Sequence, residues 1–262
     1  MLLAINANNT NVKFAVYEGG QGGEYRALGD WRIKTESGRT ADQYVVWLNQ
    51  LMVMQGLSLK SIDAAIIATV VPQSLFHLTM LCESHLGCKP LVVGDPDVKL
   101  GIAVKMDIPM STVGADRLAN AVGGHITYKK PLIVVDFGTA TTFDVVDEAG
   151  NYIGGAIAPG INLSVEILHS ATAMLPRIVI ERPARVIGKS TTEAMQSGIF
   201  WGYVGLVEGM VKRIADEFGS TLDVVATGGL APLFHGQTPV ISHLDADITM
   251  RGLVEIYRRN RA

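Results

Sequence analysis

The chain has 262 residues, enough for one large domain or two modest ones at about 150 residues per domain. Hydrophobic residues make up 48% of the chain and charged residues 18%, a composition that excludes a disordered protein. Lysine and arginine number 22 against 25 acidic residues, so the net charge of −3 gives no basic field to attract nucleic acid or anionic lipid.

The N-terminal segment, Met1 to Ile5, is apolar but lacks the basic start of a signal peptide, and the chain turns polar at Asn6. No apolar run reaches the ~20 residues needed to span a bilayer. The two cysteines, Cys82 and Cys88, are spaced for neither a metal knuckle nor a C-x-x-C redox pair. We therefore expect a cytoplasmic protein with reduced thiols and with no membrane or nucleic-acid partner.

The chain contains an internal repeat. Residues 2–10 align with residues 132–140 at a constant offset of 130, close to half of the chain length. Each copy has a short apolar strand, a polar residue at its end, a turn of small residues and a second strand of alternating character. Hairpins are common and short matches arise by chance, but the offset near half of the chain favours duplication.

Strands and helices alternate between and after the two hairpins. A capping box, Thr40 to Gln43, predicts the start of a helix that ends near Gly56. The further predicted elements are a strand at 63–70, a helix from Pro72, a strand at 90–93, a helix at 115–128, a strand at 152–157, a helix at 191–218 and a strand at 222–226. This order predicts an α/β fold with mixed sheets, divided into domains of residues 1–119 and 120–262.

Two hairpin loops that face each other across a cleft would suit a nucleoside triphosphate, because turns of small residues let backbone N–H groups approach phosphate oxygens. The segment Asp136 to Thr142 adds a carboxylate at a strand end, where it can organise a cation. The turn Thr227-Gly228-Gly229 is a third small-residue loop, able to seat the nucleoside end. The alternative is that Asp and Gly serve turn geometry alone.

Six motifs, in this order, resemble those of the type III pantothenate kinases. They are Asn9-Thr10-Asn11, Gly114-Ala115-Asp116-Arg117, Asp136-Phe137-Gly138-Thr139-Ala140-Thr141-Thr142, Gly154-Gly155 with Pro159-Gly160, Gly188-Lys189-Ser190-Thr191 with Met195-Gln196-Ser197-Gly198, and Thr227-Gly228-Gly229. The resemblance spans nearly the whole chain. It implies two duplicated ribonuclease H-like domains with a nucleotide cleft between them, as in the superfamily of acetate and sugar kinases, heat-shock ATPases and actin.

The resemblance also implies an activity: transfer of the ATP γ-phosphate to the primary hydroxyl of pantothenate, the first step of coenzyme A synthesis. Asp116 would be the base that accepts the hydroxyl proton, although an acid there can also be an ordinary first-turn residue of a helix. The implied substrate-binding residues are Gly114, Ala115, Asp116, Arg117 and Thr191, the last close to a homodimer interface. The implied ATP-binding residues are Asn6, Ala7, Asn8, Asn9, Thr10, Asn11, Val12, Lys13 and Thr139. Asp136 would bind K⁺ or NH₄⁺, and Mg²⁺ would accompany ATP.

Several positions depart from the family pattern. The first loop usually reads Asp-x-Gly-Asn-Thr, whereas this chain has Asn6 and Asn8 in place of the Asp and the Gly. An amide attracts Mg²⁺ less strongly than a carboxylate, so the loop would bind the ion more weakly. The alternative is a re-formed loop, in which the two asparagine side chains bond to each other or directly to the phosphate. Met106 replaces a common Tyr, and Ala171 and Met174 replace an Arg and a Lys.

Two other functions remain open from the sequence. The first is a catalytically weak relative that acts as a regulatory or accessory binding protein, which the change at Asn6 would explain. The second is a kinase for another small hydroxylated or carboxylated substrate. The presence of both Asp116 and Asp136 favours an active enzyme, since a drifting site has no physical reason to keep both.

Overall fold

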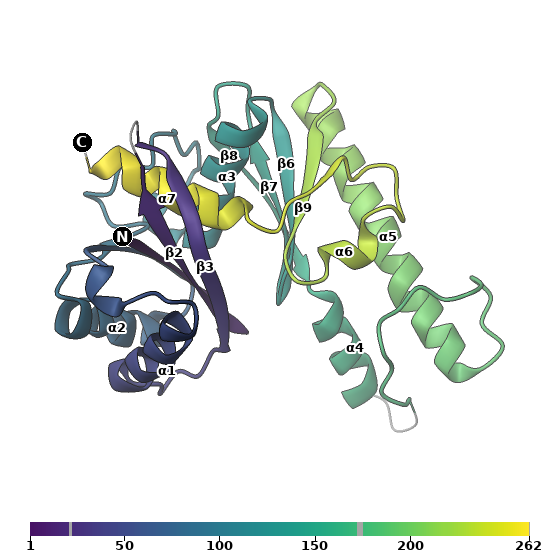
Figure 1. Ribbon diagram of the computed structural model, residues 1–262. Helices are drawn as coiled ribbons and strands as arrows, with labels where there is room; N and C mark the ends of the chain where they lie inside the picture. Colours follow the sequence, from purple (N-terminus) through teal and green to yellow (C-terminus); the bar gives the residue numbers. More distant parts are fainter. Residues whose placement is uncertain (21–22, 172–174, 262) are drawn as a thin grey trace. The chain divides into compact units, whose positions relative to one another are not determined.

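The computed structural model describes residues 1–20, 23–171 and 175–261 (Figure 1). Contacts divide the chain into two compact units, one of Met1–Thr127 with Asp247–Ala262 and one of Tyr128–Ala246. The C-terminal helix therefore belongs with the first half of the chain. No helix among the described residues is both long and apolar enough to cross a membrane.

The first unit is a five-stranded mixed sheet with helices on both faces (Figure 1). Its strands are β1 (Leu2–Ala7), β2 (Asn11–Gly19), β3 (Tyr25–Lys34), β4 (Ala64–Thr69) and β5 (Leu91–Val92), in the order β3-β2-β1-β4-β5. Its helices are α1 (Ala41–Met54), η2 (Leu59–Ser61), α2 (Pro72–Met80), η3 (Leu81–Leu86), η4 (Met110–Thr112), α3 (Ala115–Tyr128) and α7 (Ile248–Asn260). β1 pairs antiparallel with β2 and parallel with β4.

Alternate residues of β1 face two different helical layers. Leu3 and Ile5 pack with Tyr44 and Leu48 of α1, and α7 contacts β1 and β4 from the other side. The start of α1 is the predicted capping box: the Gln43 amide donates to Thr40 Oγ1 at 3.3 Å, and the Thr40 amide donates to the Gln43 side chain at 2.9 Å. The sequence prediction of this helix start is confirmed.

Helices α3 and α7 pack closely because each has a glycine at the contact. A Cβ on Gly252 would overlap the Ala119 carbonyl, and a Cβ on Gly123 would overlap the carbonyl of Ile248. This close packing accounts for the return of the C-terminal helix to the first unit.

The second unit repeats the sheet of the first. Its elements are β6 (Leu132–Phe137), β7 (Ala140–Val146), β8 (Tyr152–Pro159), α4 (Ile161–Ser170), α5 (Thr191–Phe218), β9 (Asp223–Thr227), α6 (Ala231–Phe234) and β10 (His243–Leu244). The strand order is β10-β9-β6-β7-β8, which is the first sheet's order read from its other edge. Aromatic residues of α5 and α6 pack on β6 and β7, with Phe200 and Phe234 both fully buried.

The repeat predicted from the sequence thus corresponds to a repeat in the structure. β1 begins at Leu2 and β6 at Leu132, 130 residues apart, and each strand opens a three-stranded antiparallel run with a parallel neighbour on its other side. The predicted α/β fold of two duplicated halves is confirmed.

Candidate functional site

The first hairpin loop joins β1 to β2 and holds the predicted ATP-binding segment. The strand pair ends where Ala7 faces Val12, and the Asn8 amide donates to the Asn11 carbonyl at 3.0 Å to close the turn. Asn9 at the tip is exposed. Thr35, the residue that follows β3, donates its hydroxyl hydrogen to the Asn8 carbonyl at 2.6 Å. The loop backbone is therefore held on both sides.

Two amide oxygens in this loop are buried without a hydrogen-bond partner among the described residues: Asn6 Oδ1 and Asn8 Oδ1. The Asn6 residue is only 7% exposed. Neither oxygen accepts a bond from the other amide, so that form of a rearranged loop is not present. A buried unsatisfied acceptor costs about 1–3 kcal/mol, and such groups in native proteins call for an explanation. Oxygen atoms of this kind fit a hard cation such as Mg²⁺ or its bound water.

Lys13, the last residue of the predicted ATP-binding segment, is held by two carboxylates. Its Nζ lies 3.1 Å from Asp30 Oδ2 and 2.9 Å from Asp247 Oδ1, at the start of α7. The hydrogen bond from Lys13 keeps the pKa of Asp247 below its ordinary value, against partial burial, which raises it. A phosphate contact by Lys13 would have to compete with both carboxylates.

The predicted catalytic base, Asp116, lies in the first turn of α3. Its Oδ1 accepts a hydrogen bond from the Arg117 amide at 2.8 Å, which fixes the carboxylate. Burial raises the pKa of Asp116 above its ordinary value, and the Arg117 amide and guanidinium oppose that shift. A Cβ on Gly114 would lie 2.7 Å from Asp116 Oδ1, so a larger residue there would displace this carboxylate. Ala115 beside it is buried.

The first loop and the Asp116 segment lie at the same edge of the first sheet. The Val70 amide donates to the carbonyl of Ala7 at 3.1 Å, where β1 ends. A Cβ on Gly114 would lie 3.4 Å from Val70 Cγ1. Val70 thus lies beside both the end of β1 and the residue two positions before the predicted base.

The second hairpin loop joins β6 to β7 and carries Asp136 and Thr139. Asp136 lies directly opposite Thr142 of β7 and Thr227 of β9. Gly228 follows β9 with a φ of 91°, and a Cβ on it would lie 2.5 Å from Asp136 Oδ1. The small-residue turn after β9 therefore allows the backbone to approach the predicted cation ligand closely.

The tip of the second loop rests on the end of β8. Thr139 is exposed, and a Cβ on Gly160 would overlap the Thr139 carbonyl. The structure thus brings Asp136, Thr139 and the Gly228 turn together in the second unit.

One carboxylate beside this loop was not singled out from the sequence. Asp144 is fully buried in β7, where its Oδ2 accepts from the Thr142 hydroxyl at 3.0 Å and its Oδ1 accepts from the Tyr152 hydroxyl at 3.1 Å. An acidic residue inside the apolar alternation of β7 was the available sequence signal. Asp144 fixes the hydroxyl of Thr142, the residue directly opposite Asp136.

In the second unit, Thr191 lies away from the hairpin loop that carries Asp136 and Thr139. It is exposed at the first residue of α5, after the N-cap Ser190. Tyr203, whose hydroxyl contacts the Thr141 hydroxyl of β7, is 12 residues further along the helix, a distance of about 18 Å at 1.5 Å per residue.

The three departures outside the first loop have different surroundings. Met106 is half-buried, and Ala171 is exposed at the C-terminal end of α4. Met174 lies outside the described residues.

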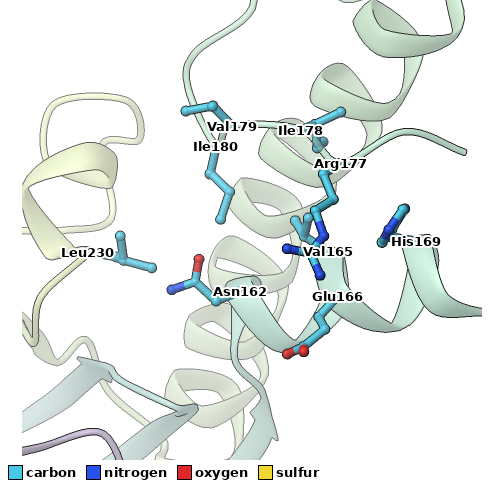
Figure 2. A pocket seen from close by; sticks show the side chains of 9 residues that line it. All are labelled: Asn162, Val165, Glu166, His169, Arg177, Ile178, Val179, Ile180 and Leu230. Atoms are coloured by element: carbon cyan, nitrogen blue, oxygen red, sulfur yellow. The ribbon is translucent and has the colours of Figure 1, made fainter. Parts of the chain in front are cut away.

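A cavity of about 440 Å³ lies in the second unit between α4 and the segment that follows it (Figure 2). It is bounded at one end by Leu230, which follows the Gly228-Gly229 turn, and Asn162 in the first turn of α4 lies near that end. Three charged or titratable side chains, Glu166, His169 and Arg177, line the cavity together with the apolar side chains of Val165 and residues 178–180. Its size is within the usual range for small-molecule sites.

Comparison with known proteins gives a consistent result along the whole chain. The sequence profile of the type III pantothenate kinases matches residues 2–213. A type III pantothenate kinase of Paramagnetospirillum magneticum is 61% identical over 260 residues, covering 99% of this chain and 98% of the relative. That of Rhodospirillum rubrum is 59% identical over 261 residues, covering 100% of this chain and 99% of the relative.

Solved structures with the same fold are much more distant in sequence. A Campylobacter jejuni protein described with the Baf family of transcriptional activators has a TM-score of 0.60 at 17% identity, covering 99% of this chain and 98% of that one. The activator of 2-hydroxyisocaproyl-CoA dehydratase from Clostridium difficile, solved with bound ADPNP, has a TM-score of 0.55 at 12% identity, covering 99% and 95%. These likenesses establish the fold alone.

Proposed function

Because this chain belongs to the type III pantothenate kinase family, we propose that Asp116 is its catalytic base and that its hairpin loops bind ATP. As a member of that family, the enzyme uses ATP to phosphorylate pantothenate, the first step of coenzyme A synthesis. The observation that carries this function is the 61% identity to a pantothenate kinase across 99% of the chain.

Asp116 accepts the proton of the attacking pantothenate hydroxyl. Its raised pKa makes it a stronger base than an ordinary aspartate, and the bond from the Arg117 amide to Oδ1 orients it. In phosphoryl transfer, alignment of the nucleophile and stabilisation of charge supply most of the rate enhancement. The carboxylate therefore serves both to align the hydroxyl and to remove its proton.

The residues around Asp116 bind pantothenate. Gly114 and Ala115 let the substrate approach the backbone, and the Arg117 guanidinium donates hydrogen bonds to polar substrate atoms. Thr191 supplies a hydroxyl at the exposed end of α5.

The first loop, Asn6 to Lys13, binds the phosphates of ATP. Mg²⁺ bound with ATP would neutralise charge on the phosphates, and the buried oxygens of Asn6 and Asn8 fit the ion or its water shell. In the complex those two oxygens would gain partners that no described residue supplies.

In the second unit, Asp136 binds a monovalent cation and Thr139 contacts ATP. The strand-end carboxylate of Asp136, with the Thr142 hydroxyl opposite it, provides the oxygen ligands that K⁺ or NH₄⁺ needs. The cavity beside Leu230 receives the nucleoside end, because the Gly228 turn that leads to it also packs against Asp136.

The enzyme acts as a homodimer, through an apolar surface of the second unit. The exposed large apolar side chains there are Ile157, Leu163, Ile167, Val179, Val186 and Ile187. They lie on β8, on α4 and in the segment just before Thr191, and a second copy of the chain would cover them. A monomeric mass by light scattering at micromolar concentration would contradict this.

ATP dependence favours a cytoplasmic location.

A coupled assay of ADP release tests the function. Purified protein with ATP, Mg²⁺ and K⁺ should release ADP when pantothenate is added, but not with acetate or simple sugars. ADP release that is the same with and without pantothenate would contradict it and favour an accessory binding role. Release driven by acetate or a sugar would instead indicate a kinase for another substrate.

A further inference from the structure

Tyr203 connects the long helix α5 to the second hairpin loop. Its side chain is in the aromatic core, with its ring centroid 6.5 Å from that of Phe137 and 5.6 Å from that of Phe234, and the residue is only 6% exposed. The hydroxyl at the end of this ring contacts two groups, the Thr141 hydroxyl and the Pro159 carbonyl, the latter at 2.7 Å.

The direction of these two hydrogen bonds follows from the donors available. A carbonyl oxygen can only accept, so the single phenolic hydrogen of Tyr203 is donated to Pro159. The Thr141 hydroxyl must then donate to the Tyr203 oxygen. Burial raises the pKa of Tyr203 further above its ordinary value of 10.0, so the phenol keeps its proton at any working pH. The arrangement is therefore a fixed, fully paired network.

The two groups that Tyr203 holds lie on neighbouring strands beside the loop, Thr141 on β7 and Pro159 at the end of β8. Thr141 is directly opposite Phe137, so the pair closes the hairpin just before its turn. Pro159 is directly opposite Ala140, and the next residue, Gly160, is packed against the Thr139 carbonyl. One hydroxyl thus ties β7 and the end of β8 together immediately beneath the turn at residues 138–140.

We infer that Tyr203 is a positioning residue for ATP, acting through Thr141 and Pro159 to hold the Gly138-Thr139 turn in its phosphate-binding conformation. This inference rests on the proposed role of Thr139 in ATP binding. It assigns to a buried residue of α5 the role of holding the ATP-binding turn in place. Loss of the hydroxyl removes a partner from the buried Thr141 hydroxyl and from the Pro159 carbonyl, which loosens the Gly138-Thr139 turn.

Steady-state kinetics of matched variants test the role. Tyr203→Phe keeps the ring and Thr141→Val keeps the shape, so each should raise the KM for ATP about fivefold with little change in kcat. The two changes remove the same network, so the double variant should also show about a fivefold rise, not their product. Thr141→Ser keeps the hydroxyl and should restore a near-normal KM.

Thr238→Val is the matched control. Its buried hydroxyl donates at 2.6 Å to Oε1 of Glu208. Glu208 is also a residue of α5, but it lies five residues beyond Tyr203. It should lower the melting temperature as Thr141→Val does while leaving the KM for ATP unchanged.

An unchanged KM for ATP in both Tyr203→Phe and Thr141→Val, with only a lower melting temperature, would overturn the inference and leave Tyr203 a purely structural residue. If Tyr203→Phe fails to fold, the Thr141→Val and Thr141→Ser pair decides alone. If the wild-type protein does not turn over pantothenate, the dissociation constant of Mg²⁺-ADP in the same variants replaces the KM. The two failures can thus be told apart.

Discussion

The two hairpin loops are related by duplication but differ in how their polar atoms are satisfied. In the first loop, Asn6 Oδ1 and Asn8 Oδ1 are buried without a partner among the described residues. In the second, the Thr141 hydroxyl is paired with Tyr203 and that of Thr142 with Asp144. The two hairpins thus share their strand pairing but differ in the hydrogen bonding of their polar side chains.

The difference indicates that the loops reach their binding conformations in different ways. A loop with unsatisfied buried acceptors is less stable alone and gains stability when a ligand supplies the missing partners. A loop whose hydroxyls are already paired is organised before the ligand arrives, so less ordering is needed on binding. We therefore expect the first loop to depend on Mg²⁺ and nucleotide, and the second to be set by the fold.

The largest effect should come from Asp116, at the sheet edge of the first loop. Asp116→Asn keeps the size of the side chain but removes the base, and kcat should fall by ~10² or more while the circular dichroism spectrum is unchanged. In the wild type, the rate should rise with pH through the raised pKa of this carboxyl, because only the ionised form accepts a proton. Near-normal turnover of the variant would leave Asp116 as a helix-terminus residue.

The next effect should come from Asp136 in the second loop. Asp136→Ala removes the carboxylate opposite Thr142, so activity should fall about tenfold or more and lose its dependence on K⁺ or NH₄⁺. Rates measured in Na⁺ and in K⁺ test this directly. Equal wild-type rates in the two salts would argue against a cation site at Asp136.

A smaller effect should follow from Asn6→Asp in the first loop. A carboxylate would attract Mg²⁺ more strongly than the buried amide oxygen does, so the Mg²⁺ concentration for half-maximal rate should fall about threefold. A Mg²⁺ titration of both proteins measures the shift. A variant that is slower at every Mg²⁺ concentration would show that the asparagine itself is a working part of the loop.

The smallest effect concerns stability. The pKa of Asp116 is raised in the folded state because burial favours the neutral carboxyl. The contribution of this carboxyl to the free energy of unfolding is therefore lost as pH rises through that pKa. Asp116→Asn should therefore raise the free energy of unfolding by about 1 kcal/mol at pH 8 and by less at pH 4. Urea unfolding at the two pH values measures this, and an equal change at both would contradict the proposed burial cost.

Local sequence signals predicted much of the fold. The repeat located β1 and β6, the Thr40 capping box located α1, and α3 and α5 begin and end at the predicted residues. No helix was expected over 248–260 and no strand over 25–34. β3 lies at the edge of its sheet and is half exposed, so it lacks a clear apolar alternation. The packing of α7 on the first unit depends on contacts between residues more than 120 positions apart.

Sequence motifs indicate the turns of the candidate site, but not the residues that hold those turns in place. Asp116, Asp136 and the small residues near them are recognisable because motifs keep them adjacent in the sequence. Tyr203 is 62 residues from Thr141, and in a long apolar helix its ring has the pattern of a core residue. Only the structure shows that its hydroxyl contacts the Thr141 hydroxyl and the Pro159 carbonyl. Likewise, no pattern shows that Asn6 Oδ1 has no hydrogen-bond partner among the residues that the structure describes.

Hydrogen exchange followed by mass spectrometry tests the contrast between the loops most directly. In the free protein, peptides covering residues 136–143 should exchange slowly and those covering residues 6–13 should exchange faster, despite similar strand pairing on either side. Adding Mg²⁺ with a non-hydrolysable ATP analogue should slow exchange in the first loop much more than in the second. Equal protection of the two loops in the free protein, or an unchanged first loop with Mg²⁺ and nucleotide, would contradict the account.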